Sequence, residues 1–320
     1  MYFLKRIVFV KRHVWFFRIY LVWPFVLLTA FPACTEIGLD YRKEEGTVVI
    51  APDWSAFACP ASACYRFYAV GSEEAAYEGE DASAESFSLV LPVGGYHLLA
   101  YNTDARGVAF TGLEHRSKAE VCLTSEAQPG GIYSWSVDNV EVPLRSAVQH
   151  MPVPRSLVRQ MVLHFRVTGM EEAMVLEGRL NGVYPSVFLL SGSPSAESVA
   201  AAPETNTKFA ATLAPVEARD ALPAYMASAD VRLLGLLSPE FGACYDCRLH
   251  LQVGNAAGET YGATVDMNKT VTDIINSYEG ELPLDKTIEV SVGINLLNTV
   301  LTAAVKGWTE GSGEGEVGTY

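Results

Sequence analysis

Positive charge is scarce in this chain. The 320 residues include 23 lysines and arginines against 37 aspartates and glutamates, which gives a formal net charge of −14. Five of the basic residues lie within the first 18 positions, so removal of that segment would lower the net charge to −19. A surface this acidic repels phosphate backbones. Nucleic-acid binding is therefore excluded, and charge alone cannot hold the chain to anionic lipid.

Residue patterns that carry catalysis are also missing. The histidines are scattered singly, and none has the spacing with another histidine or a carboxylate that places metal ligands on one helix. No phosphate-cradling glycine loop and no G-x-S-x-G elbow occur. We therefore predict no enzymatic activity, no cofactor and no metal site. The six histidines are His13, His97, His115, His150, His164 and His250.

Cysteine is sparse, at six residues, and Cys34 closes an N-terminal apolar segment. In an exported protein, the remaining five can form disulfides, but an odd number leaves at least one thiol free or paired between chains. Cys59 and Cys64 flank the short stretch CPASAC and can bridge it. The pairing of these two with the other three, Cys122, Cys244 and Cys247, stays open.

Cys244 and Cys247 form a C-Y-D-C motif, a spacing that suggests a redox or metal site. A thioredoxin-type site requires this motif at the start of a helix, whereas the surrounding FGACYDCRLHLQV alternates like a strand. A zinc site needs two further ligands, and Cys59 and Cys64 fall in what we predict to be another domain. A structural or incidental role is the favoured interpretation.

A long apolar run occurs at residues 19–34, IYLVWPFVLLTAFPAC, after several basic residues. This order is typical of a secretory signal peptide, and a cysteine after a small residue is where a bacterial lipoprotein is cut and acylated, although Phe31 and Pro32 depart from the usual lipobox. We predict a signal peptide at 1–33, a lipidated Cys34 and a tether at 34–46. A cleaved signal that leaves a soluble secreted protein is an alternative, as is a single-pass anchor, but the run is shorter than the roughly 20 residues that a span requires.

The first folded unit is predicted at residues 47–152. Apolar and polar residues alternate with period two in short runs between glycine and proline clusters, and helical periodicity is hard to find. This pattern predicts a β-sandwich. The expected strands are 47–50, 65–70, 86–91, 96–101, 108–110, 119–123, 132–137 and 140–143.

A second all-β unit is predicted at residues 153–310, after a proline-punctuated junction, with a Gly/Glu-rich tail at 311–320. Residues 171–180 fit either a short helix or strands, 195–206 is predicted to be a loop, and 271–277 a brief helical turn. The expected strands are 157–168, 182–190, 209–213, 229–237, 248–253, 260–265 and 287–292.

Several stretches together resemble the Bacteroidales fimbrial lipoprotein superfamily, which includes fimbrillins and minor or anchor subunits. They are VVIAPDWSAFACPASACYRFYAV, FSLVLPVGGYHLLAYNTD, MVLHFRVTGMEEAMVLEGRLNGVYPSVFLLSG and TVDMNKTVTDIIN. The resemblance covers most of the chain after Cys34, and its motifs are structural. It implies an all-β fold of two tandem transthyretin-like β-sandwich domains after a lipoprotein signal peptide.

The resemblance further implies a surface-exposed lipoprotein, anchored in the outer membrane by acyl chains such as palmitate on Cys34. Its role would be structural, anchoring or assembly within fimbriae that serve cell adhesion, with strand exchange to other subunits. Residues 132–143 or 287–306 are candidate donated strands, although ordinary internal strands are the favoured interpretation. The alternative function is a glycan- or protein-binding surface lipoprotein that uses aromatic side chains such as Trp54, Tyr101 or Trp135.

Overall fold

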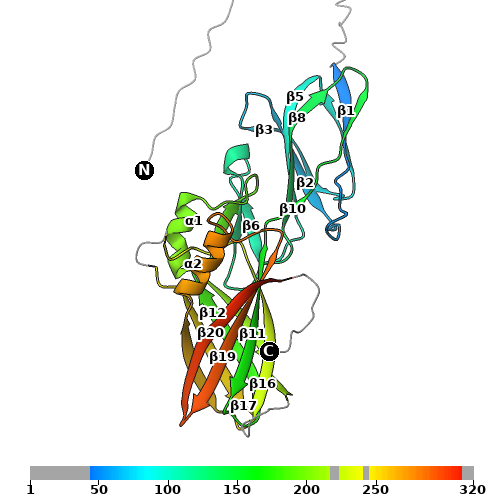
Figure 1. Cartoon of the computed structure of the whole chain (residues 1–320). Coiled ribbons are helices and arrows are strands. Elements are labelled where there is room, and N and C mark those ends of the chain that lie inside the picture. Colours follow the sequence, from blue (N-terminus) through cyan, green and yellow to red (C-terminus); the bar gives the residue numbers. More distant parts are fainter. Residues whose placement is uncertain (1–43, 217–222, 241–244, 312–320) are drawn as a thin grey trace, which may run out of the picture. The chain divides into compact units, whose positions relative to one another are not determined.

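The computed structural model describes residues 44–216, 223–240 and 245–311, and these are mostly β-strand (Figure 1). Within these ranges the α-helices are α1 (Ala196–Ala201) and α2 (Asn268–Ser277). Neither has the length and apolar character needed to cross a bilayer, and no other helix in the described ranges does. The expectation of a predominantly β protein is confirmed.

Two facing sheets form the smaller sandwich. One has the order β4-β1-β9 and the other β10-β8-β5-β2-β3. Val48 and Ile50 from the first sheet pack with Tyr65, Phe67 and Leu98 from the second, and all five are fully buried. The strands are β1 (Glu45–Ile50), β4 (Phe87–Pro92), β9 (Ala147–His150), β10 (Arg155–Ser156), β8 (Tyr133–Val142), β5 (Gly94–Asn102), β2 (Ala63–Ala69) and β3 (Ala75–Ala82).

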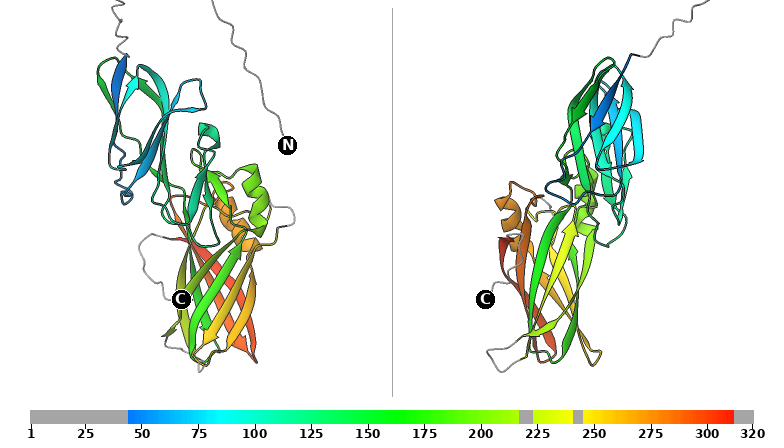
Figure 2. Two further views of the ribbon diagram at one scale, coloured as in Figure 1. Left: turned by 180° about the vertical axis from the view of Figure 1, so that it is seen from behind. Right: turned by 90° about the vertical axis from the view of Figure 1, so that its right-hand side faces the viewer.

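The larger sandwich also has two sheets, ordered β15-β16-β11-β19-β20 and β14-β12-β17-β18 (Figure 2). The parallel pairing of β11 with β19 and the antiparallel pairing of β19 with β20 form most of the first sheet. The strands are β15 (Ala214–Val216), β16 (Ala224–Leu233), β11 (Arg159–Thr168), β19 (Thr287–Leu297), β20 (Val300–Gly311), β14 (Asn206–Thr212), β12 (Ala173–Asn181), β17 (Arg248–Asn255) and β18 (Thr260–Asp266).

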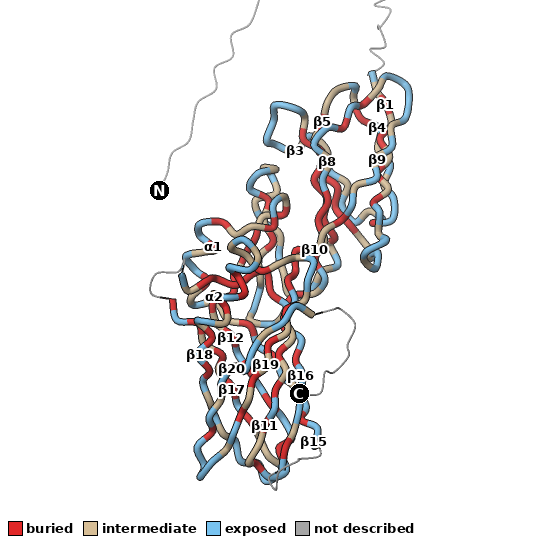
Figure 3. Tube along the Cα trace, in the orientation of Figure 1, coloured by how far each residue is buried: buried red, intermediate tan, exposed pale blue. Residues whose placement is uncertain are grey.

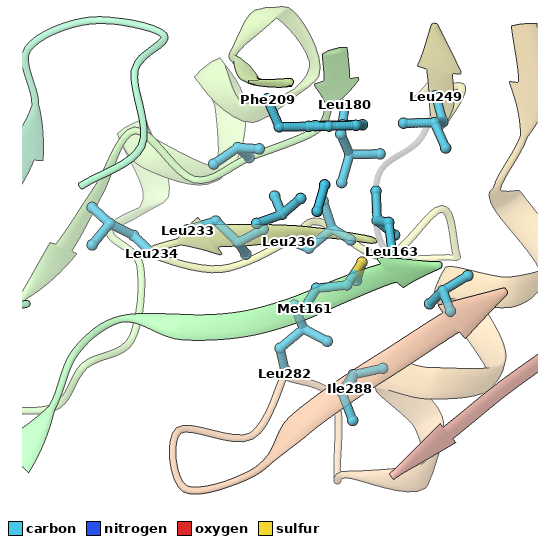
Figure 4. Packing of buried hydrophobic residues seen from close by; sticks show 14 of the residues in the cluster. Met161, Leu163, Leu180, Phe209, Leu233, Leu234, Leu236, Leu249, Leu282 and Ile288 are labelled. Carbon is cyan, nitrogen blue, oxygen red and sulfur yellow. The ribbon is translucent and has the colours of Figure 1, made fainter. Parts of the chain in front are cut away.

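Strict alternation along β11 explains how the larger core is filled. Met161, Leu163, Phe165 and Val167 are buried, while the residues between them are exposed or half-buried (Figure 3). The buried set packs against leucines from both sheets and against Phe209 (Figure 4). Because each such side chain contributes about 1.5–3 kcal/mol on burial, the period-two pattern determines which face of the strand is inside.

A further sheet joins strands that are distant in sequence. It has the order β13-β7-β6, built from β13 (Ser186–Phe188), β7 (Glu120–Leu123) and β6 (Val108–Thr111). Leu123 donates its backbone N–H to Pro185 O at 2.8 Å, and Leu189 donates to Ala119 O at 2.8 Å. Val121 and Val187 belong to the larger hydrophobic cluster. Residues 108–123 therefore pack with the second half of the chain, and the domain limits at 47–152 and 153–310 stay a prediction.

Two arginines tie loops of the larger sandwich together. Arg159, which is only 2% exposed, donates to the carbonyls of Leu282 at 2.7 Å, Gly192 at 3.3 Å and Leu234, and to Glu281 Oε2 at 2.8 Å. Burial lowers the pKa of its guanidinium, since desolvation disfavours the charged form. Arg155 also binds backbone carbonyls. It donates to the carbonyls of Leu189 and Ser191, and to Ser134 Oγ.

The structure differs from the sequence-based expectations in a few elements. The loop predicted at 195–206 is wrong: Ser195 caps helix α1 by accepting a hydrogen bond from the backbone N–H of Ser198, and a 3-10 helix (Ala202–Glu204) follows. The ambiguous segment 171–180 is strand β12, the strand expected at 182–190 shrinks to β13, and α2 is longer than a single turn. Strands β3, β9 and β20 were not predicted.

Candidate functional site

Strand β1 is the first element after the predicted tether, and it is the central strand of its sheet. It pairs antiparallel with β4 over its whole length and parallel with β9 over its last four residues. Val93 N donates to Glu44 O at 2.7 Å and Thr47 N donates to Ser146 O at 2.9 Å, so neighbouring loops also bind the strand. Val48 and Ile50 of this strand are fully buried.

This arrangement determines how β1 responds to a pull from its N-terminal end. Ladder hydrogen bonds run across the strands, so a force along β1 acts on the bonds to both neighbours in shear and at the same time. To slide out along its own axis, β1 would have to break its bonds to β4 and to β9 together.

Cys34, the predicted lipidation site, lies outside the described residues. Cys59 and Cys64 are both free thiols in the structure, and their surroundings differ. Cys59 is exposed and donates to Pro60 O at 3.5 Å, whereas Cys64 is buried and donates to Glu78 Oε1 at 3.4 Å. Burial raises the pKa of Cys64 to about 11, which leaves little thiolate for chemistry near neutral pH. A disulfide between Cys59 and Cys64 stays a prediction.

The C-Y-D-C motif is described from Tyr245 onward. Cys247 is fully buried, its N–H donates to Asn268 Oδ1 at 2.9 Å, and burial raises its pKa to about 12. The Asp246 carboxylate accepts from Arg248 Nε at 2.7 Å and from Asn268 Nδ2 at 3.0 Å. These contacts fix a turn, and a thiol with a raised pKa is a poor nucleophile.

Tyr245 shows why glycine occupies position 182. Its hydroxyl donates to Asn181 O at 3.0 Å and fills the place where a Cβ on Gly182 would lie. Gly182 also has φ +83°, in the left-handed region that favours glycine. This close approach locks the end of β12 to the segment that precedes β17.

The aromatic side chains considered for ligand binding are mostly internal. Tyr101 is 3% exposed and Trp135 is 2% exposed, so neither offers a free face to a glycan. Trp54 is half-buried, donates its indole N–H to Ala84 O at 2.9 Å, and meets Trp135 edge-on with ring centroids 5.2 Å apart. Trp54 and Trp135 pack in the core of the smaller sandwich, whereas Tyr101 belongs to the larger hydrophobic cluster and packs against Phe110 of β6. These three side chains do not form an open binding platform.

The segments considered as donated strands belong to the chain's own sheets. Most of 132–143 forms β8, an inner strand between β10 and β5, and β19 lies between β11 and β20. Strand β3 forms one edge of the smaller sandwich and carries Glu78, Glu80 and Asp81. Charges on an edge strand discourage unspecific pairing with other chains.

The described ranges contain few clustered metal-ligating side chains. No group of three or more histidine, cysteine, aspartate or glutamate side chains that could hold a metal ion occurs there. Apart from His13, which lies outside those ranges, the histidines stay apart. For example, His164 donates to or accepts from Ser228 Oγ at 2.8 Å and lies 3.4 Å from Glu289, whereas His250 contacts Thr264 Oγ1 at 3.1 Å.

A hollow in the described part of the chain lies on the larger sandwich. Its volume is about 570 Å³, and its lining comes from β11, β16, β19 and β20. No local pattern in the sequence indicated it, since it combines the β19–β20 hairpin with Arg166 and Thr168, which lie more than a hundred positions earlier. They are Arg166, Thr168, Ala224, Gly293, Ile294, Asn295, Thr302, Ala303, Ala304 and Lys306.

The sheets and their shared cores define a β-sandwich protein. No protein-family model matches the chain, and neither does any curated protein. Solved structures do match it. A candidate adhesin from Bacteroides thetaiotaomicron matches at 12% identity and a TM-score of 0.49, covering 83% of this chain and 97% of that one.

Two other matches have comparable coverage. The fimbrial anchor protein Mfa2 from Porphyromonas gingivalis matches at 12% identity and a TM-score of 0.46, covering 82% of this chain and 97% of that one. A candidate polysaccharide-binding protein from Bacteroides thetaiotaomicron matches at 12% identity and a TM-score of 0.44, covering 83% and 98%. Each of these matches is a likeness of structure at 12% identity.

Proposed function

We propose that this chain is a lipid-anchored protein of the outer-membrane surface that acts as a structural, anchoring or assembly subunit of fimbriae. Cys34 would carry the acyl chains, residues up to 46 would form the tether, and other fimbrial subunits would be its partners. The names of the matched proteins, which include adhesins and a fimbrial anchor, agree with this role.

The observation that carries the proposal is the position of β1. It begins at Glu45, eleven residues after Cys34, and it is hydrogen-bonded on both sides. A protein that joins a lipid to an extended polymer must transmit force between them. A first strand that is hydrogen-bonded to a neighbour on each side meets this requirement, whereas a first strand without such bonds would not.

The lipid part of the proposal is tested with Cys34→Ala in cells that express the full chain. We expect the unchanged protein in the membrane fraction, with incorporation of labelled palmitate, and the variant in the soluble fraction without label. Cys59→Ala is the matched control, because it removes an exposed cysteine and should leave both readouts unchanged. A variant that stays in the membrane fraction to the same extent would refute lipid anchoring.

The fimbrial part is tested separately by deleting the reading frame and examining the cells by electron microscopy. We expect fimbriae that are fewer, altered in length or shed into the medium, and restored by the complete gene. Complementation with Cys34→Ala should restore the protein but not the attachment. Fimbriae of normal number, length and attachment in the deletion strain would overturn this role.

A further inference from the structure

The hollow on the larger sandwich arises from small residues that meet across three strands. Arg166 on β11 is in register with Gly293 on β19, and Gly293 is in register with Ala304 on β20. Because glycine and alanine have small side chains, these two adjacent positions leave a depression in the outer face of the sheet. The longer side chains around them form the rim.

Two cationic side chains converge on this low point. The register of β19 and β20 shifts after Ser291, and this irregularity places Lys306 beside Gly293. A Cβ built on Gly293 would lie 2.6 Å from Lys306 Cε, so the lysine chain lies across the glycine, with Arg166 on the neighbouring strand at its other side. Within the described residues neither cation forms an ion pair.

Two like charges beside one glycine are unfavourable unless an anion lies between them. None of the residues that line the hollow is acidic, although the chain as a whole has a net charge of −14. The net negative charge of the chain repels all anions alike, so an anion that binds here must do so through short-range contacts with these side chains.

Neutral hydrogen-bonding groups complete the lining. Thr168 donates its hydroxyl to Asn295 Oδ1 at 3.2 Å and Thr302 donates to Asn295 O at 3.2 Å. The first of these contacts occupies the acceptor oxygen of the Asn295 side chain and leaves its amide N–H groups for a ligand. The hollow therefore offers a guanidinium, an ammonium and an amide as donors, a set suited to a carboxylate with neighbouring hydroxyl groups.

The backbone beneath the hollow indicates the class of ligand. β19 is paired on one side with β11 and on the other with β20 across the whole of this region. A peptide that binds by strand addition would pair with β20, which is the edge strand of this sheet and contributes to the lining. The donor groups of the hollow are instead the side chains of Arg166, Asn295 and Lys306, on three different strands. Recognition by side chains suits a hydroxyl-rich acidic saccharide better than strand addition by an extended peptide.

We propose that the hollow lined by Arg166, Asn295 and Lys306 binds a carboxylate-bearing saccharide of the uronic-acid type. Its volume of about 570 Å³ lies within the range of small-molecule sites, roughly 300–1,000 Å³. The site does not depend on Cys34 or on assembly into fimbriae, so binding by the purified chain reports on it independently of the proposed function.

The test is isothermal titration calorimetry of the purified full chain with trigalacturonate, with maltotriose as a neutral saccharide and pentaglutamate as an acidic peptide. We expect trigalacturonate alone to bind, more weakly at high salt. Arg166→Gln and Lys306→Met should each weaken binding at least tenfold, since a hydrogen bond to a charged group contributes about 1.5–3 kcal/mol. Ala304→Phe should have the same effect by filling the hollow without changing its charge.

Arg232→Gln is the matched control. Arg232 is another exposed arginine on the outer face of the same sheet, on β16, and it does not line the hollow. Circular dichroism verifies that all variants are folded. The proposal is overturned if trigalacturonate does not bind, if the Arg166 and Lys306 variants bind as well as the Arg232 variant, or if maltotriose or pentaglutamate binds equally well.

Discussion

Replacement of Arg159 by methionine tests whether one buried guanidinium holds the loops of the larger sandwich in place. Methionine occupies a similar volume and donates no hydrogen bond. In the structure Arg159 donates to three backbone carbonyls and to the Glu281 carboxylate. The substitution therefore removes four contacts while it leaves the apolar part of the side chain largely intact.

The magnitude follows from what loses a partner. Each buried carbonyl left without its donor costs about 1 kcal/mol, at the low end of the range for unsatisfied groups, because a carbonyl has a second lone pair. The Glu281 side chain is 40% exposed, so water replaces its partner and its loss contributes at most about 1 kcal/mol. Removal of a desolvated charge returns part of the total. We expect a net destabilisation of about 3 kcal/mol.

Urea unfolding followed by circular dichroism measures this difference. Glu281→Gln should cost about 1 kcal/mol or less, and Arg232→Met, at an exposed arginine, should stay within about 0.5 kcal/mol of the unchanged protein. If Arg159→Met costs less than about 1 kcal/mol at an unchanged m-value, the contacts of Arg159 do not stabilise these loops and the reasoning fails.

Three further predictions concern other parts of the chain. Gly182→Ala should lower the free energy of unfolding by about 2–4 kcal/mol, since it adds a clash with a tyrosine hydroxyl to the cost of a positive φ; Gly258→Ala, with φ +82° and open space around it, should cost only about 1 kcal/mol. In reduced protein at mildly alkaline pH, iodoacetamide should label the exposed Cys59 before unfolding and the buried Cys64 only after it, as mass spectrometry of the peptides will show; equal rates would contradict the burial. The pKa of Glu310 is lowered from 4.5 by hydrogen bonds from a lysine and a tyrosine. The stability that this carboxylate contributes is therefore present above pH 4.5 and is lost as the pH falls through the lowered value. Glu310→Gln should make unfolding less sensitive to acid, and an unchanged acid transition would refute this.

Strands with one buried face could be predicted from the sequence because their burial follows the period of two. The strands predicted at 47–50 and 157–168 are examples, and they are found as β1 (Glu45–Ile50) and β11 (Arg159–Thr168). Strand β3, AAYEGEDA, was not predicted because it is an edge strand with no fully buried residue. The choice of residues on such a strand depends on contact with water more than on packing in a core. Helix α1 escaped because six residues carry too little periodicity, although the N-cap serine at 195 was a usable signal.

The functional surfaces were less accessible to prediction, for a physical reason. The hollow requires Arg166 to lie opposite Gly293, and no local pattern specifies a register between segments so far apart. Aromatic residues such as Tyr101 and Trp135 occur both in protein cores and in exposed binding surfaces. Only their burial in the folded chain shows that these two belong to the core. The leader and Cys34 can be inferred only from the sequence, since the described residues begin at Glu44.

The long-range parallel pairings also set an order of events in time. Val48 of β1 pairs with Val148 of β9, and Met161 of β11 pairs with Ile288 of β19. Since a chain becomes available from its N-terminus, each sandwich receives an early strand long before the partner that completes its ladder, and contacts this distant form slowly. β1 can pair with β4 once residues up to 92 are present, but it gains its second neighbour only when residues up to 150 have followed. Enzymes that process the N-terminal segment would have that interval to act before folding closes around β1.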